Sequence, residues 1–240
     1  MPARRFFIEG LHADGDAVVI GGEDAHKIVR VLRLKNGDMI ELVDSGATLF
    51  EADVSIDGDR VTARVRNARR AVEKGPLIDV AQAVPKGHKM DFVVEKLTEL
   101  GVAAILPFES ERCVVRDVRD AKVDRWRRLA QAAAQQSGRI DIPPVRDVIP
   151  YDALLERFSE YEVVLFPWEV AEARALRETL PTLVANAGRI LVVIGPEGGF
   201  SHEEALRAQG ASATIISLGA LILRTETAAL FVVSVLRYLL

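Results

Sequence analysis

Short apolar runs rich in β-branched residues recur along the last two thirds of the chain, and a helical spacing of apolar positions follows each one. Strands are expected at Leu77–Val84, Ala103–Phe108, Val163–Phe166, Ile190–Ile194 and Thr214–Leu218. Helices are expected at Lys86–Leu100, Lys122–Ser137, Tyr151–Phe158 and Ala171–Leu180, and again after the last two strands. Because strands that alternate with helices of this length build parallel sheets, the pattern predicts an α/β domain.

Residues 1–70 follow a different pattern, in which short alternating runs are separated by turn signals such as Asn36-Gly37 and Asp57-Gly58. The runs are Ala17–Ile20, Asp38–Val43, Thr48–Ile56 and Arg60–Arg66. Turns at this spacing predict a compact β-barrel, interrupted by one helical stripe at His26–Leu34. Because a polar linker follows at 71–76, we expect a barrel domain over residues 1–72 and an α/β domain over residues 73–240.

Composition supports a folded chain with an uneven charge distribution. Of the 240 residues, 49% are apolar and 28% are charged, and the net charge is −4. Basic residues cluster in Arg64–Lys74 and Glu111–Arg139, whereas Ile140–Leu240 is acidic. The basic runs are either ordinary solvated surfaces or surfaces that hold a phosphate backbone, and both interpretations remain open.

Several classes of protein are excluded or disfavoured by the sequence. The longest apolar run, Ala228–Val233, is far shorter than the roughly 20 residues that span a bilayer, so no membrane segment is expected. The N-terminus lacks the apolar core of a signal peptide. A single cysteine, Cys113, excludes an internal disulfide and fits a cytoplasmic location. The four histidines lack the spacing of metal ligands, so no metal site is expected.

A glycine-rich segment, Gly195–Phe200, follows the expected strand Ile190–Ile194. Ser201 and Glu204 have the spacing of a capping box, so a helix is expected to begin there. Glycines allow the backbone to approach a ligand and leave N–H groups free to donate. The segment lacks both the Walker signature and the GxGxxG of dinucleotide-binding folds. A ligand-binding loop and a simple tight turn both remain open.

A second unusual loop follows the last expected strand. Ala220–Leu223 is apolar where polar turn residues are usual, and apolar side chains beside backbone amides suit a flat heteroaromatic ligand. Thr225 is the expected N-cap of the next helix, and Arg224 and Glu226 lie at its entrance. The alternative is a loop buried under a neighbouring subunit. Because ligands of open α/β sheets bind at the carboxyl ends of the strands, both loops are placed where a small molecule would bind.

Five segments occur in this order across the α/β region: PKGHKMDFVVEKLTELGV, SERCVV, RWRRLAQAAAQQSGR, IGPEGGFSHEE and SLGALILRTETAA. Together with RRFFI and HKIVRVLRLKNGD near the N-terminus, they resemble the 16S ribosomal RNA small-subunit (uracil-N3)-methyltransferase family of the SPOUT superfamily. The resemblance implies an α/β SPOUT methyltransferase domain with a C-terminal trefoil knot, preceded by a small PUA-like β-barrel domain. It also implies an S-adenosyl-L-methionine cofactor, a homodimer, and 16S rRNA or the small ribosomal subunit as substrate.

The resemblance also assigns residues. The implied cofactor-binding residues are Leu165, Phe166, Pro167, Ile194, Gly195, Pro196, Glu197, Gly198, Gly199, Leu218, Gly219, Ile222 and Leu223. RNA contacts are predicted for Arg4, Arg5, His26, Arg30, Arg33, Lys86, Lys89, Arg112 and Arg139. Uridine N3 carries a proton and is a poor nucleophile until that proton leaves. Glu226 is the candidate base, and Arg224 is the candidate stabiliser of the developing uracil anion.

Two departures from the family pattern keep alternatives open. The family commonly has an arginine where this chain has Leu221, and Glu-Gln where it has Gln135-Gln136. A catalytically weak or inactive RNA-binding relative is therefore the rival hypothesis. A nucleotide-binding oxidoreductase is disfavoured because the sequence lacks GxGxxG with a downstream ribose-binding acid.

Overall fold

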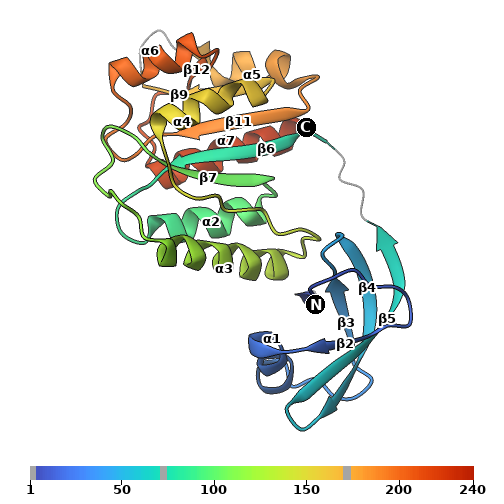
Figure 1. Ribbon diagram of the computed structural model, residues 1–240. Helices are drawn as coiled ribbons and strands as arrows, with labels where there is room; N and C mark the ends of the chain where they lie inside the picture. The colour runs from blue at the N-terminus through green and yellow to red at the C-terminus, as the bar shows by residue number, and fades with distance from the viewer. Residues whose placement is uncertain (1–3, 71–74, 170–173) are drawn as a thin grey trace. The chain divides into compact units, whose positions relative to one another are not determined.

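The computed structural model describes residues 4–70, 75–169 and 174–240, without the side chains of 174–179 (Figure 1). The chain forms two compact units. Unit 1 comprises Met1–Glu73 with Ala134–Ile142, and unit 2 comprises Lys74–Ala133 with Pro143–Leu240. The expected boundary between residues 72 and 73 lies outside the described residues. Unit 1 also includes a segment that the sequence pattern assigned to the α/β domain.

Unit 1 contains a five-stranded sheet in the order β1-β3-β4-β5-β2. The strands are β1 (Arg5–Phe7), β2 (Ala17–Ile20), β3 (Met39–Val43), β4 (Thr48–Asp57) and β5 (Arg60–Arg70). The β1–β3 pair is parallel and the other pairs are antiparallel. Alternate residues of β4 and β5, such as Val54 and Val65, are buried in one cluster. The alternating pattern of the sequence therefore marks the inner face of this sheet.

The expected helix His26–Leu34 forms differently. Helix α1 runs over Gly22–His26 and continues as a π-helical turn, η1 (Lys27–Val31). Leu32 N–H donates to the Lys27 carbonyl at 2.8 Å, an i to i−5 bond, and Arg33 at φ 53° ends the helix. The sequence prediction was therefore wrong about both ends. Ile28 remains fully buried against the sheet, which is the feature that the apolar stripe had indicated.

Unit 2 contains a seven-stranded parallel sheet in the order β10-β12-β9-β11-β6-β7-β8. The strands are β6 (Leu77–Ala83), β7 (Ala104–Glu109), β8 (Ile149–Pro150), β9 (Val163–Pro167), β10 (Arg174–Ala175), β11 (Arg189–Ile194) and β12 (Thr214–Ser217). Neighbouring strands of this sheet pair in parallel throughout the described residues. The prediction of an α/β fold with a parallel sheet is confirmed.

Helices cover both faces of this sheet. They are α2 (Lys89–Glu99), α3 (Asp120–Ser137), α4 (Tyr151–Glu156) with the 3₁₀ turn η2 (Arg157–Glu160), α5 (Leu176–Val184), α6 (His202–Gly210) and α7 (Thr225–Leu239). On β11, Ile190, Val192 and Ile194 face the cluster formed with α2, α3, α5 and α7. Leu191 and Val193 face the cluster formed with α4 and α6. Strands buried on both faces explain the continuous apolar runs in the sequence.

Two local features decide how the helices begin. The expected helix Ala171–Leu180 was wrong at its start, because β10 precedes α5 and α5 begins at Leu176. Residues 170–173 lie outside the described part of the chain. The capping box at α6 is confirmed: Ser201 Oγ accepts from Glu204 N–H at 3.2 Å, and Glu204 Oε2 accepts from Ser201 N–H at 2.9 Å. No helix in the described residues is long and apolar enough to cross a membrane.

Candidate functional site

Three loops of unit 2 leave the sheet from neighbouring strands. Strands β12, β9 and β11 are adjacent and parallel, with Ile216 opposite Pro167 and Leu165 opposite Val192. Because the carboxyl ends of parallel neighbours lie at one edge, the loops that follow Pro167, Ile194 and Ser217 meet there. The segments predicted to bind the cofactor are therefore brought together by the fold (Figure 1).

The glycine-rich loop Gly195–Gly199 is a tight turn held by packing beneath it. Gly199 N–H donates to the Pro196 carbonyl at 2.9 Å, and Gly199 has a φ of 65°, which favours glycine. A Cβ added at Gly195 would lie 3.0 Å from the ring of Phe200. That ring packs on Phe166, with the ring centroids 4.2 Å apart. The positive φ favours glycine at position 199, and a side chain at position 195 would require the Phe200 ring to shift.

A buried chain of hydrogen bonds joins this loop to α7. Thr225 Oγ1 donates to the Gly195 carbonyl at 2.6 Å and accepts from Gln82 Nε2 at 2.8 Å. Gln82 also donates to the Ala83 carbonyl at 3.0 Å and is fully buried. The expectation that Thr225 is the N-cap was wrong, because Arg224 is the N-cap and the Thr225 hydroxyl is used for these long-range bonds. The start of α7 is thus fixed to the ends of β6 and β11.

A charged cluster lies beside the same loop. Lys89 Nζ donates to Glu197 Oε1 at 2.8 Å and lies 3.7 Å from Glu226 Oε2. Glu197 Oε1 also accepts from Lys86 N–H at 3.1 Å. The hydrogen bond to Glu197 raises the pKa of Lys89. Burial alone would raise the pKa of Glu197, but the bonds from Lys89 and from backbone N–H groups lower it on balance.

Glu226 is the least satisfied carboxylate of this cluster. Its side chain is 15% exposed, and its Oε2 atom is buried and accepts no hydrogen bond from the described residues. A buried acceptor without a donor is costly in a folded protein, and such atoms call for a ligand, water or functional explanation. Arg224, two residues earlier, is exposed at the N-cap of α7.

The loop after β7 is attached to the glycine-rich loop by one hydrogen bond and to α6 by another. Arg112 Nη1 donates to the Gly198 carbonyl at 3.0 Å. Glu204, which is buried, accepts from Glu111 N–H at 2.8 Å through Oε1 while its other oxygen caps α6. Arg112, predicted to bind RNA, therefore lies directly on the predicted cofactor loop.

The remaining predicted cofactor residues differ in exposure. The side chains of Leu165, Phe166 and Ile194 are buried in the core, so only their backbone groups are available to a ligand. Pro196 is also buried, whereas Pro167, Leu218 and Leu223 are partly buried. Gly219 and Ile222 are exposed. These predicted residues can therefore contact a ligand mainly through backbone groups and through the exposed side chain of Ile222.

The predicted RNA-binding residues of unit 1 divide into two groups. His26, Arg30 and Arg33 are exposed, and Arg30 forms only a 3.5 Å ion pair with exposed Asp59. Arg4 is partly buried. Arg5, in contrast, has a structural role.

The Arg5 guanidinium is buried and fully engaged. It donates to Glu41 at 2.7 and 3.0 Å and also to the Gly138 carbonyl. Only 9% of the side chain is exposed, so the RNA contact predicted for Arg5 does not fit the structure. Arg139 is similarly restricted, since it pairs with Asp141 and is 10% exposed.

Lys86 is exposed, whereas Lys89 is held by the two carboxylates described above. The RNA contacts of these two lysines and of Arg112 stay predictions. Within the described residues, no group of three or more His, Cys, Asp or Glu side chains has the arrangement of a metal site.

Two residues of the site were missed from the sequence. Gln82 is a polar residue near the carboxyl end of a mainly apolar strand, which also contains Asp79 near its start, and a polar side chain at that end of a strand was the available signal. Glu204 was recognised only as a helix cap, because nothing local indicates its second bond to Glu111.

Comparison with known proteins follows the same division of the chain. A model described as an RNA methyltransferase domain matches residues 73–237, and one described as an RNA methyltransferase PUA domain matches residues 20–66. Ribosomal RNA small subunit methyltransferase E of Bacillus subtilis is 32% identical, covering 98% of this chain and 96% of its own length. A Neisseria gonorrhoeae structure of the same name, bound to S-adenosyl methionine, is 30% identical with a TM-score of 0.88, covering 99% of this chain and 98% of that one. A putative methyltransferase from Legionella pneumophila, in complex with bound cofactor SAM, is 30% identical with a TM-score of 0.89 and the same coverage.

Proposed function

The chain belongs to the RNA methyltransferase family, and from that premise we propose that it methylates N3 of a uridine in small-subunit (16S) ribosomal RNA, with S-adenosylmethionine as methyl donor. One observation carries the proposal. The glycine-rich loop Gly195–Gly199, the apolar loop Leu218–Leu223 and the buried Glu226 Oε2, which accepts no hydrogen bond from the described residues, all lie at one edge of the sheet. We propose the cytoplasm as the location of the reaction, because the proposed substrate is small-subunit ribosomal RNA.

The residues at this edge fit the proposed cofactor. An added Cβ at Gly199 or Gly219 would meet no atom within 4 Å, and both residues have positive φ. The backbone at these two points is therefore open to a ligand, and glycine keeps it so. Gly195–Gly199 and Leu218–Leu223 are proposed to hold the adenosyl group through backbone groups, with Ile222 against its base. When bound, S-adenosylmethionine supplies an electrophilic methyl group.

Glu226 is proposed as the base that removes the N3 proton. The buried Oε2 atom has an acceptor position that a substrate N–H would fill. Lys89, 3.7 Å away, balances the charge of the carboxylate without hydrogen-bonding to that oxygen. The first turn of α7 also favours a negative charge, because the helix dipole is positive there.

Arg224 is proposed to stabilise the uracil anion. It is exposed at the N-cap of α7, two residues from Glu226. A guanidinium at this position would donate to O2 or O4 as negative charge develops on the ring. Uridine N3 lies on the Watson–Crick edge, so the target nucleotide must be unpaired or removed from its stack.

A homodimer and a C-terminal trefoil knot are also proposed. Phe231 and Tyr238 of α7 and Leu221 of the preceding loop are large apolar residues left exposed in a single chain, which supports coverage by a second copy. Strand β12 lies on the far side of β9 from β11, yet α7 returns to pack on β11 and β6, as a threaded C-terminus requires. Sedimentation of the wild type and of Phe231→Asp tests the dimer, since a monomeric wild type would refute it.

The direct test of the function is methyl transfer to unmethylated small ribosomal subunits, followed by mass spectrometry of the nucleosides. We expect 3-methyluridine at one position. Glu226→Gln should lower the rate by about 10²–10⁴-fold, as for loss of a general base, while leaving S-adenosylmethionine binding within a few-fold. Glu203→Gln, an exposed glutamate in the first turn of α6, is the matched control.

Two outcomes would overturn these assignments. Donor binding without any methyl transfer would favour the inactive RNA-binding relative. A Glu226→Gln variant as active as Glu203→Gln would remove Glu226 from the chemistry while leaving the overall activity intact.

A further inference from the structure

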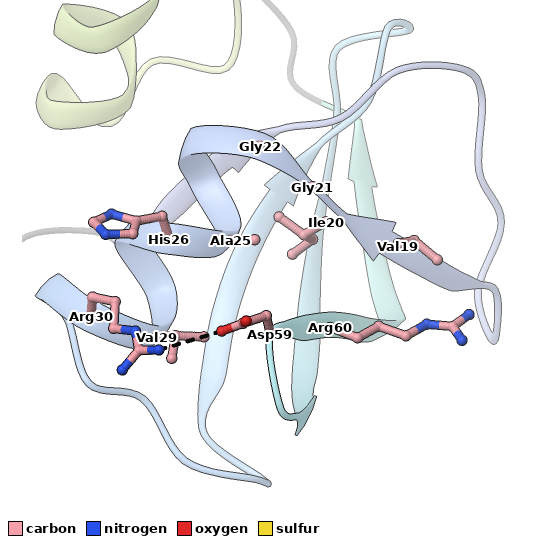
Figure 2. Close-up of a pocket in the computed structure, with 10 residues that line it drawn as sticks. All are labelled: Val19, Ile20, Gly21, Gly22, Ala25, His26, Val29, Arg30, Asp59 and Arg60. Carbon is pink, nitrogen blue, oxygen red and sulfur yellow. Dashed lines mark hydrogen bonds and ion pairs between the residues drawn. The ribbon is translucent and has the colours of Figure 1, made fainter.

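An open depression in unit 1 is lined by aliphatic residues, glycines and charged residues. It has a volume of about 660 Å³, within the range of small-molecule sites. Its lining comes from the end of β2, from α1 and η1, and from the turn between β4 and β5. Figure 2 shows these segments around it.

The depression has an apolar wall. Val19, Ile20, Ala25 and Val29 contribute aliphatic side chains. Val19 is 60% exposed, so its side chain is accessible to a ligand. Gly21 adds no side chain, and an added Cβ there would meet no atom within 4 Å. A flat ring could therefore lie against aliphatic groups here without displacing protein atoms.

The rim of the depression is mainly cationic. Arg30 and His26 lie on the helical side, with the Arg30 guanidinium directed at Asp59, and Arg60 extends away on the other side (Figure 2). The single lining carboxylate, Asp59, is 92% exposed and pairs with Arg30 at 3.5 Å, so water competes with the pair. Arg60 has no ion-pair partner among the described residues. The rim is therefore suited to anions, and an extended strand that crosses it would meet a guanidinium on each side.

The backbone around the depression is also specialised. Residues Lys27–Val31, which carry Val29 and Arg30, form a π-helical turn, a rare geometry that occurs frequently at functional sites. The fold therefore keeps an unusual helix at the wall of the depression.

We propose that this depression binds an unpaired nucleotide of the RNA substrate, with the base against Val19 and Val29 and the adjoining phosphates on Arg30 and Arg60. The inference rests on the proposed function and adds Val19, Gly21 and Arg60 to the residues that recognise RNA. Bases in a duplex are stacked and inaccessible to such a depression, so single-stranded loops are the expected ligand. The site therefore contributes selection of unpaired RNA through residues of unit 1, which take no part in the methyl-transfer chemistry proposed for unit 2.

The test compares two matched pairs of variants in the full chain. Val19→Asp places a negative charge on the apolar wall, and Val31→Asp does the same at a valine that is 65% exposed and does not line the depression. Arg60→Ala removes a rim cation, and Arg64→Ala removes an exposed cation from the same strand. Gly21→Leu fills the depression without changing its charge.

Binding is measured by fluorescence anisotropy with two labelled RNAs, a small-subunit hairpin with an unpaired loop and a fully paired duplex of equal length. Val19→Asp and Gly21→Leu should weaken hairpin binding at least tenfold, and Val31→Asp no more than about threefold. Arg60→Ala should lower the slope of log K against log salt by about 1, as expected for one lost phosphate contact, whereas Arg64→Ala should not. Duplex binding should change little in every variant.

Three results would overturn the inference. Equal losses of hairpin affinity in Val19→Asp and Val31→Asp would show that an added negative charge weakens RNA binding wherever it lies, without a role for the depression. Hairpin and duplex binding that weaken together would exclude selection of unpaired RNA. Hairpin affinity that stays unchanged in Val19→Asp and Gly21→Leu would show that the depression does not bind an unpaired nucleotide, whatever the effect on methylation of assembled subunits. Methyl transfer by the wild type is scored separately, so failure of the proposed function is distinguishable from failure of this site.

Discussion

The hydroxyl of Thr225 provides the sharpest test of how the candidate site is held together. Thr225→Val keeps the shape of the side chain but removes the donor to the Gly195 carbonyl and the acceptor of Gln82. Thr225 is 5% exposed, so water cannot easily replace either bond. Because an unsatisfied buried polar group costs about 1–3 kcal/mol, the loss of unfolding free energy should be roughly 2–4 kcal/mol.

Two measurements check this expectation. The midpoint temperature of thermal unfolding should fall by about 4–16 °C, because each kcal/mol of lost stability lowers it by roughly 2–4 °C in a domain of this size. Calorimetric titration with S-adenosylmethionine should show about tenfold weaker binding. This factor corresponds to about 1.4 kcal/mol of the lost free energy being needed to hold the glycine-rich loop in its binding conformation. Thr227→Val is the control, because Thr227 is exposed on the same helix.

A double variant separates the hydrogen bond from side-chain shape. Gln82→Met removes the other partner of Thr225 with little change in volume. If the pair is coupled, Gln82→Met with Thr225→Val should lose less stability than the sum of the single variants, by about 0.5–3 kcal/mol. Strict additivity, or a Thr225→Val protein as stable as Thr227→Val, would refute the account.

Three further outcomes are expected. Gly195→Ala should destabilise the protein by about 1–3 kcal/mol in urea unfolding, because its Cβ would lie 3.0 Å from Phe200, whereas Gly210→Ala, with no atom within 4 Å, should not. The lowered pKa of Glu197 stabilises the fold above its ordinary value of 4.5, and this contribution is lost as the pH falls below 4.5 and through the lowered pKa; in Lys89→Met the melting temperature should therefore fall less steeply as the pH is lowered below 4.5. S-adenosylmethionine at 100 times its Kd should stabilise the wild type by about 2.7 kcal/mol in thermal unfolding, and no shift would contradict the cofactor assignment.

Much of the fold was predictable because burial leaves a pattern in the sequence. Strands covered on both faces appear as continuous apolar runs, and β6, β9 and β11 were therefore located to within a residue or two. The start of α6 was predictable because its cap is local, with Ser201 and Glu204 three residues apart. The parallel sheet then placed the two unusual loops at one edge.

The features that were missed depend on contacts between distant residues. Thr225 has the chemistry of an N-cap, but its hydroxyl bonds to groups 30 and 143 residues away, and those bonds determine its position. Lys89, a basic residue near the start of α2, was predicted to contact RNA. Only the folded chain reveals that two carboxylates hold it, one of them 108 residues away. Local sequence rules contain no information about such partners.

The two departures from the family pattern have different physical consequences. Gln135 is buried in unit 1, where its Nε2 donates to Asp24 at 3.2 Å and its Oε1 accepts from Lys27 at 3.1 Å. A glutamate could not donate to Asp24, whose pKa is already raised by burial, so glutamine satisfies this environment better than the residue common in the family. Leu221 is 79% exposed, and it has an aliphatic side chain where the family commonly has an arginine. The first departure therefore affects only packing and hydrogen bonding within unit 1. The second bears on catalysis, because without an arginine at position 221 the proposed stabilisation of the uracil anion rests on Arg224.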